Sequence, residues 1–426
     1  MLTRPFLTEL DSRAHVKGSI DPLGAMAIWT RLGRRVVGNL TTVTTSVKDF
    51  KTVVVGFGLL ADARRGAAHE AGTDDLGTFL RWEQLAAYTR FRAGDRRFPG
   101  IRRVRARLGA RPIVPLSAER DCQILGNQKS YGLWGLLTAP SRASGLLERE
   151  ANELTLAAEE FVGSVWKPRL SPVWRKLIDW VSRDNRRFNL ERVASDLARI
   201  EEIWQRYLPG EQPFWRHHLV GGGPLDPTGG RQQRLASLLR RTLADEQFAF
   251  SQASVRHLAG QAKKTDRELS EDLFDIAACE AVLAPAAALF GYLLTQDRQR
   301  IERPVDAIRR RWPSRLAIDR DRFERLSPDL ANASGSNRIA GLWQEVAGDF
   351  AEGRWARSLE RLLQINRLVM EARGGGAWIV EEGGVLRVRI RSEETALPSA
   401  DRLERLWWHP YFLSSLRTIV AELEAA

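Results

Sequence analysis

Residues 131–161 read YGLWGLLTAPSRASGLLEREANELTLAAEEF, and this stretch decides how the N-terminal part of the chain is interpreted. Apolar residues at helical spacing lead into SGLLE at residues 144–148. A short polar interval follows, and ELT at residues 153–155 begins a second extended segment, after which residues 157–162 have the composition of another helix. The pattern predicts the order helix, strand, turn, strand, helix, with residues 149–152 forming an exposed turn.

This order resembles a winged helix. In such modules the helix before the first wing strand enters the major groove of DNA, and the wing touches an adjacent groove or the phosphates. Because proline disrupts a helix interior, Pro140 predicts an unusually short recognition helix, roughly residues 141–144. We expect the module to cover about residues 115–165. The alternative is a helical hairpin with a wing-like turn that arises by chance.

An arginine-rich run precedes this stretch. Residues 96–111, RRFPGIRRVRARLGAR, contain seven arginines and no acidic residue. Ile101, Val104 and Leu108 recur at helical spacing, so a helix can bury them while its arginines point to solvent. Arginine binds phosphate bidentately and adds affinity without reading base sequence, although an ordinary solvated face would look the same. The residues expected to contact nucleic acid are Arg96, Arg97, Arg102, Arg103, Arg105, Arg107, Lys129, Ser141, Arg142 and Arg149.

The composition is that of an ordinary globular protein with a basic excess. The chain has 426 residues, and its 65 Lys and Arg against 53 Asp and Glu leave a formal net charge of +12. That charge favours a polyanionic partner, DNA over RNA, although a high-GC genome that writes Arg in place of Lys would give the same excess. Cys122 and Cys279 form no disulfide framework, which predicts a reducing, cytoplasmic location.

Helical periodicity dominates the chain, and the predicted fold class is mainly α. We expect a multi-domain helical protein that carries the winged-helix module and a small C-terminal β-hairpin. The sequence GGGPLDPTGG at residues 221–230 is the clearest linker. The expected regions are residues 1–168 with the winged helix, a helical connector at 169–222, a helical domain at 231–330, and a C-terminal helical region with the hairpin at 331–426.

The hairpin is expected from residues 377–382 and 385–391. Gly383 and Gly384 join them, and a Gly-Gly pair suits a two-residue turn. Three arginines share one face of the second strand, which predicts either a phosphate contact or, more simply, a solvated face. These arginines are Arg387, Arg389 and Arg391.

Two apolar segments each have a second interpretation. Residues 276–294 approach the length of a membrane span, but Glu280, Pro285 and many alanines favour a buried core helix. Residues 53–61, VVVGFGLLA, match the glycine fingerprint of dinucleotide-binding folds in form. No second strand follows them, and Ser46 can cap a helix that runs through them. We favour a buried helix in both cases, with no membrane association and no nucleotide cofactor.

The sequence presents no catalytic or metal-binding set. Its six histidines lack the spacing of metal ligands, and Asp319 and Asp321 lie in a segment of alternating charge that is typical of surface ion pairs. We therefore expect no catalytic residue, no metal and no cofactor. Acids from distant segments can still converge in a fold, so an enzyme remains an alternative.

An aromatic cluster precedes the last amphipathic segment of the chain. Residues 407–412 read WWHPYF. Rigid aromatic side chains can stack on bases or anchor another protein chain, and core packing of the terminal helix is the alternative. The residues expected to bind a partner are Trp407, Trp408, Tyr411 and Phe412.

The function best supported by the sequence is binding of nucleic acid, above all duplex DNA, by a non-catalytic subunit or regulator. One form of this hypothesis places the chain in a bacterial genome-defence complex with an antiviral role. The first alternative is a helical scaffold with protein partners, and the second is an unrecognised nuclease or nucleotide enzyme. Arginines gathered on one face would favour nucleic acid, and an even spread would favour the scaffold.

Overall fold

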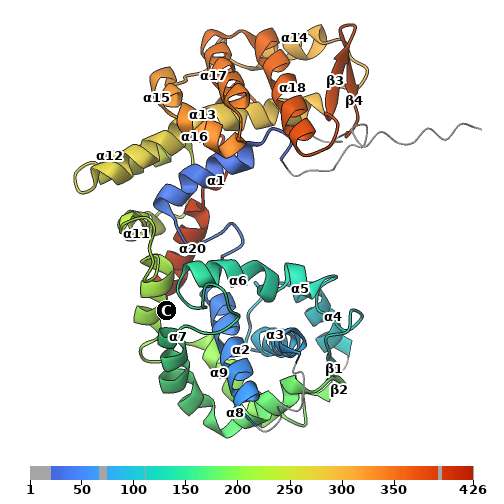
Figure 1. Ribbon diagram of the computed structural model, residues 1–426, viewed down its shortest axis with the longest axis vertical. Helices are drawn as coiled ribbons and strands as arrows, with labels where there is room; N and C mark the ends of the chain where they lie inside the picture. Colours follow the sequence, from blue (N-terminus) through green and yellow to red (C-terminus); the bar gives the residue numbers. More distant parts are fainter. Residues whose placement is uncertain (1–20, 67–73, 111, 392–395, 426) are drawn as a thin grey trace, which may run out of the picture. The chain divides into compact units, whose positions relative to one another are not determined.

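The computed structural model describes residues 21–66, 74–110, 112–391 and 396–425 (Figure 1). The chain is 63% helix, which confirms the mainly α fold class. It divides into two compact units: unit 1 comprises Met1–Val36 and Asp245–Tyr411, and unit 2 comprises Val37–Ala244 and Phe412–Ala426. The chain therefore passes from one unit to the other three times. The expected boundaries at residues 168, 222 and 330 do not coincide with this division.

The described residues of unit 2 form helices and one short two-stranded sheet (Figure 1). Two π-helical turns extend α7 and α10, and a 3-10 turn follows α11. The elements of unit 2 are α2 (Val47–Arg65), α3 (Asp75–Arg92), α4 (Ile101–Ala110), β1 (Ile113–Leu116), α5 (Gln128–Tyr131), α6 (Leu133–Ala143), α7 (Leu156–Phe161), η1 (Val162–Trp166), α8 (Lys167–Ser182), β2 (Asn185–Asn189), α9 (Ala194–Gln205), α10 (Glu211–Trp215), η2 (Arg216–Val220), α11 (Arg231–Arg241), η3 (Thr242–Ala244) and α20 (Leu413–Glu424).

Helix α2 forms the centre of unit 2. The Ser46 hydroxyl caps it by accepting a hydrogen bond from the Lys48 N–H, and all of residues 47–60 except Lys48 are buried. A side chain at Gly56 would place its Cβ only 2.5 Å from the Trp82 ring, so this glycine allows α3 to approach closely. Residues 53–61 thus form a core helix, as expected, and not the strand and phosphate loop of a dinucleotide fold.

Residues 131–161 form a helix, a tight turn and a second helix. The prediction that Pro140 shortens the first helix to residues 141–144 is wrong, because α6 runs from Leu133 to Ala143 and buries the proline. Packing of α6 against α2 and α3 offsets the cost of that proline. After α6, Leu147 and Leu154 form a single antiparallel bridge, and the Glu148 N–H donates to the Glu153 carbonyl at 2.9 Å. Arg149 lies on the exposed turn between them.

The helix α20 completes unit 2 from the far end of the chain. It packs against α11, α2 and η2 through an apolar face that includes Leu416, Ile419 and Leu423. Its Glu422 carboxylate accepts a hydrogen bond from the Val47 N–H at 3.1 Å, at the first turn of α2. The beginning and the end of unit 2 are therefore joined by direct contacts.

Unit 1 is organised around the long helix α13, against which α1, α12 and α15 pack (Figure 1). Among the described helices, α13 is the one with the length and hydropathy of a membrane span, and 83% of its most apolar window is buried inside the unit. The elements of unit 1 are α1 (Ala25–Val36), α12 (Gln252–Ala262), α13 (Arg267–Leu293), α14 (Glu302–Arg311), α15 (Arg320–Arg325), α16 (Ser327–Ser334), α17 (Asn337–Glu352), α18 (Trp355–Ala372), β3 (Ile379–Glu382), β4 (Val385–Val388) and α19 (Ala400–Glu404).

The predicted hairpin of unit 1 is confirmed. Strands β3 and β4 pair antiparallel, and Glu382 lies opposite Val385 across the turn. Gly383 and Gly384 have φ angles of 59° and 79°, a left-handed conformation that non-glycine residues rarely adopt. Two of the three arginines lie in ion pairs, Arg387 with Glu382 and Arg391 with Asp297, whereas Arg389 is exposed and has no ion pair among the described residues. This arrangement favours the solvated face over a row of phosphate contacts.

Candidate nucleic-acid interface

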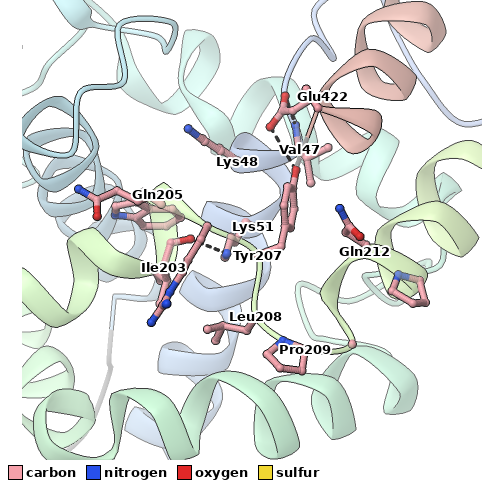
Figure 2. A pocket seen from close by; sticks show the side chains of 15 residues that line it. Val47, Lys48, Lys51, Ile203, Gln205, Tyr207, Leu208, Pro209, Gln212 and Glu422 are labelled. Atoms are coloured by element: carbon pink, nitrogen blue, oxygen red, sulfur yellow. Dashed lines mark hydrogen bonds between the residues drawn. The ribbon is translucent and has the colours of Figure 1, made fainter. Parts of the chain in front are cut away.

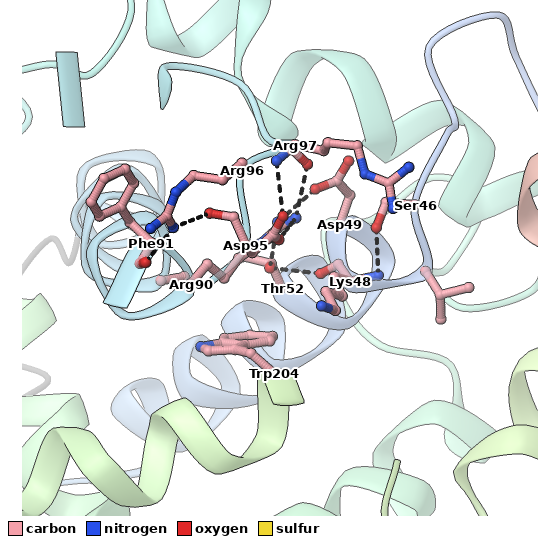
Figure 3. A network of polar contacts seen from close by, with 12 residues as sticks. Ser46, Lys48, Asp49, Thr52, Arg90, Phe91, Asp95, Arg96, Arg97 and Trp204 are labelled. Carbon is pink, nitrogen blue, oxygen red and sulfur yellow. Dashed lines mark hydrogen bonds and ion pairs between the residues drawn. The ribbon is translucent and has the colours of Figure 1, made fainter. Parts of the chain in front are cut away.

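A buried ion cluster closes the C-terminal end of α3 (Figure 3). Arg90 is only 1% exposed, and its guanidinium contacts Asp49 at 2.6 Å and Asp95 at 2.8 Å. Burial raises the pKa of Asp49, and the positive charge of Arg90 opposes that rise. The same guanidinium lies 5.2 Å from the centre of the Phe98 ring. Arg90 therefore fixes the start of the loop that leads into α4, and it is not available to a ligand.

Helix α4 uses its arginines in two ways. Arg103 donates to the carbonyls of Gln123 and Leu125, so it holds the loop that follows β1. Arg107 donates to the Tyr88 hydroxyl at 2.9 Å and to the Cys122 carbonyl at 2.8 Å. The expectation that Arg107 points to solvent is therefore wrong, since these oxygen atoms draw its guanidinium back onto the protein.

The remaining arginines of α4 face solvent. Arg102 and Arg105 are exposed, and within the described part of the chain neither side chain takes part in a hydrogen bond or an ion pair. The two arginines that precede α4 differ from each other. The Arg96 guanidinium stacks 3.9 Å from the centre of the Phe91 ring, and Arg97 is exposed. Arg111, the last arginine of the run, lies outside the described residues. The free positive charge of the run is thus smaller than its seven arginines suggest.

Strand β2 brings further arginines to the same side of unit 2. It pairs with β1, and β1 follows α4 and packs against it (Figure 1). Arg183, which follows α8, and Arg187, within β2, are exposed, whereas Arg186 forms ion pairs with Glu119 and Asp121. The sequence does not reveal this contribution, because residues 113–116 and 185–189 pair across a long stretch of chain.

Helix α6 and the turn after it present few side chains that could hydrogen-bond to the edge of a DNA base. Lys129 and Arg149 are exposed. Ser141 was expected to contact nucleic acid, but it is fully buried, so its hydroxyl cannot reach a ligand. Arg142 donates to the Asn152 side chain at 2.7 Å and to the Glu148 carbonyl at 3.1 Å, and so ties α6 to the turn. The exposed positions of α6 are Gly135, Ala139 and Ala143, which carry no hydrogen-bond donor in their side chains. Direct reading of bases by α6 therefore has no support.

The aromatic cluster of residues 407–412 is divided between core and surface. Tyr411 and Phe412 are buried, Trp407 is half-buried, and Trp408 is 54% exposed. Of the four residues expected to bind a partner, only Trp408 presents most of its side chain to solvent. Tyr411 and Phe412 lie in the protein interior, where a partner cannot reach them.

One buried carboxylate of unit 1 holds residues 408–411 of this cluster. Glu280 of α13 is fully buried and accepts hydrogen bonds from the backbone N–H groups of Trp408 at 2.5 Å and His409 at 2.9 Å. The Tyr411 hydroxyl donates to it at 3.0 Å, and the His409 Nδ1 lies 2.8 Å from its Oε2. Burial also raises the pKa of the Tyr411 hydroxyl, which therefore stays protonated as a donor. Glu280 thus holds the backbone at Trp408 in place through hydrogen bonds.

A pocket of 710 Å³ opens beside α2 in unit 2 (Figure 2). Lys51 lies at its inner end, and its ammonium donates to the Ile203 carbonyl at 2.5 Å and to Glu211 Oε1 at 2.9 Å, while Glu211 Oε2 lies 2.7 Å away. Burial lowers the pKa of Lys51, and Glu211 opposes that effect. With its donors occupied in this way, Lys51 is a structural cross-link between α2 and the C-terminal end of α9, not a nucleophile.

No metal site was found among the residues that the structure describes: no group of three or more His, Cys, Asp or Glu side chains is arranged to hold an ion. Comparison of the chain with protein-family models, with curated proteins and with solved structures gave no match.

Proposed function

We propose that this chain binds nucleic acid, with duplex DNA as the ligand of unit 2, and that it does so without catalysis. The observation that carries the proposal is the pair of exposed side chains Arg102 and Arg105 on α4. Their neighbours Arg103 and Arg107 are held by backbone carbonyls, so the two free guanidinium groups are not needed for the fold. Free guanidinium groups on one helix face repel each other, and a phosphate backbone relieves that repulsion.

The surrounding surface supports the same ligand. Arg97 precedes α4, Lys129 lies on α5 and Arg187 lies on β2, and all three are exposed. Such side chains contact phosphates and add affinity that is independent of base sequence. In this proposal the turn that carries Arg149 acts as a wing against the duplex. The small residues on the exposed face of α6 give no base readout, so we expect binding to duplexes of any sequence.

The cysteines indicate the compartment that this function would need. The two cysteines, Cys122 and Cys279, are free and buried, which suits a reducing compartment such as the cytoplasm. A protein that binds duplex DNA without base specificity and without cleaving it is suited to act as a subunit of a larger assembly. A genome-defence complex is one such assembly.

The test is a fluorescence anisotropy titration of the full chain on a random-sequence duplex across a salt series. If about six phosphates are contacted, affinity falls by roughly a thousandfold between about 50 and 200 mM salt. The double variant Arg102→Ala/Arg105→Ala is expected to reduce the slope of log K against log salt by about 1.8, since each phosphate contact contributes about 0.9.

The matched control removes the same charge elsewhere. Arg325 and Arg338 are exposed residues of unit 1, and the variant Arg325→Ala/Arg338→Ala lowers the net charge by the same amount. We expect this control to keep the slope of the unchanged protein. Equal losses of slope in the two double variants, or no binding of duplex at low salt, would refute the proposal.

A further inference from the structure

Unit 1 contains a pocket of 600 Å³ that is lined by arginine and tryptophan. Arg311, the last residue of α14, forms part of its wall, and Arg402 of α19 and Arg405 form another part. Trp407 and Trp408 line it as well. Its volume lies in the range of sites that bind small organic ligands. Among the described residues that line the pocket, none is acidic.

The charge of this pocket is not balanced by its neighbours. Arg311, Arg402 and Arg405 are exposed, and no side chain or carbonyl in the described ranges accepts a hydrogen bond from them. The acids of α14 are already engaged, because Asp306 pairs with Arg309 and Glu302 pairs with Arg300. Three like charges at one pocket repel each other, and an anion that enters removes that cost.

The aromatic side of the pocket is unusual for a surface. Trp408 is 54% exposed, and among the described residues of unit 1 only it and Met26 are exposed large apolar side chains. Stacking of a second flat group on the indole removes apolar surface from water, which is favourable. A nucleic-acid base is such a group, and stacking of one base on an aromatic side chain contributes about 1–3 kcal/mol.

The pocket is formed in advance of any ligand. Glu280 fixes the backbone of Trp408, and the Trp407 ring packs 5.4 Å from the Tyr411 ring and 6.2 Å from the Phe250 ring, centre to centre. Pro398 also lines the pocket, and its carbonyl accepts a hydrogen bond from the Trp312 Nε1–H at 3.1 Å. A ligand therefore meets side chains on an ordered backbone and does not have to order that backbone itself.

We infer that this pocket binds one unpaired nucleotide of a single-stranded nucleic acid. The base stacks on the indole of Trp408, and the flanking phosphates pair with Arg311, Arg402 and Arg405. A base inside a duplex is stacked on both faces and cannot reach the indole, so the pocket selects strand ends and single-stranded segments. This site lies in the other unit from α4, and the inference holds whether or not α4 binds duplex DNA.

The experiment measures binding of a fluorescent thymidine decanucleotide to the full chain by anisotropy. Trp408→Ala is expected to weaken binding by about 5- to 150-fold, the equivalent of losing one stacked base. Trp408→Phe should retain most of the affinity because it keeps an aromatic face. Arg402→Ala/Arg405→Ala should lower the salt slope by about 1.4, at about 0.7 for each phosphate of a single strand.

Two controls separate the pocket from the rest of the protein. Met26→Ala removes another exposed apolar side chain of unit 1, which is 50% exposed, and should leave oligonucleotide binding unchanged. Arg102→Ala/Arg105→Ala should also leave it unchanged, while Trp408→Ala should leave duplex binding unchanged. Circular dichroism shows whether each variant keeps its helical content.

Three results would overturn the inference. The first is a Trp408→Ala variant that is folded and binds the oligonucleotide as the unchanged protein does. The second is a poly-glutamate peptide that competes as well as the oligonucleotide, because that result would assign the arginines to acidic protein partners. The third is loss of oligonucleotide binding in Arg102→Ala/Arg105→Ala alone, which would place the single strand on α4 and leave the proposed function standing.

Discussion

The C-terminal end of α3 and the solvent face of α4 use the same side chain for opposite purposes. Arg90 is buried between Asp49 and Asp95, where it holds two chain segments together, whereas Arg102 and Arg105 extend into solvent without a described partner. Arg107 lies between these extremes, because it is half-buried and bound to carbonyl oxygens. The difference shows that arginine content alone does not measure an interaction surface. What each guanidinium contacts decides whether it serves the fold or a ligand.

The largest effect is expected at Arg90. Arg90→Ala leaves the buried carboxylates of Asp49 and Asp95 without their partner, and loss of one member of a buried ion pair typically costs about 3–5 kcal/mol. The measurement is the free energy of unfolding in urea, followed by circular dichroism. A cost below about 1 kcal/mol would mean that water replaces the guanidinium, and the contrast with α4 would then disappear.

A buried carboxyl group on α3, that of Glu83, predicts a pH-dependent free energy of unfolding. Glu83 accepts hydrogen bonds from the Leu133 N–H at 2.7 Å and the Gln128 side chain at 2.8 Å, and burial raises its pKa from 4.5 to about 7. Between these values the folded chain keeps a proton that the unfolded chain has released. The contribution of Glu83 to stability is therefore full below about pH 4.5 and falls as the pH rises to about 7, by about 3 kcal/mol in all.

The variant Glu83→Gln isolates the contribution of Glu83 to the pH dependence of the unfolding free energy, since glutamine does not titrate. The difference in unfolding free energy between the unchanged protein and the variant should shift in favour of the variant from pH 5 to pH 7 and stay constant above pH 8. A difference that is constant over the whole range would show that Glu83 titrates normally despite its burial.

A smaller effect is expected at Arg107. Arg107→Ala removes hydrogen bonds to the Tyr88 hydroxyl and the Cys122 carbonyl in a half-exposed site, which should cost about 1–2 kcal/mol. Arg102→Ala/Arg105→Ala is the matched control and should change stability by less than about 0.5 kcal/mol. If the double variant lost more stability than Arg107→Ala, the arginines of α4 would have to be reassigned between fold and surface.

Local patterns predicted several elements of this fold correctly. The Ser46 cap and the apolar run after it gave α2, and Gly383-Gly384 gave the turn between β3 and β4. Glu280 within residues 276–294 was evidence for a core helix, and α13 is one. Each of these signals lies within one element or one turn, where the physical cause and its effect are close in sequence.

The features that the sequence could not predict depend on contacts between distant segments of the chain. Periodicity correctly places Val104 on the buried face of α4, but it cannot show that carbonyls from residues 121–125 capture Arg103 and Arg107. The aromatic cluster of residues 407–412 looked uniform in sequence. Its division into a buried Tyr411 and an exposed Trp408 follows from Glu280, which lies more than a hundred residues earlier in the chain.

The position of α20 has a consequence for the newly made protein on the ribosome. Translation produces residues 37–244 early, yet α20, which packs on α11 and whose Glu422 meets Val47, is made only after all of residues 245–411. During that interval the surfaces that will receive Leu416, Ile419 and Leu423 face water. Transiently exposed apolar surfaces of this kind are prone to association, so we expect the yield of folded protein to fall when synthesis of the second half of the chain is slow.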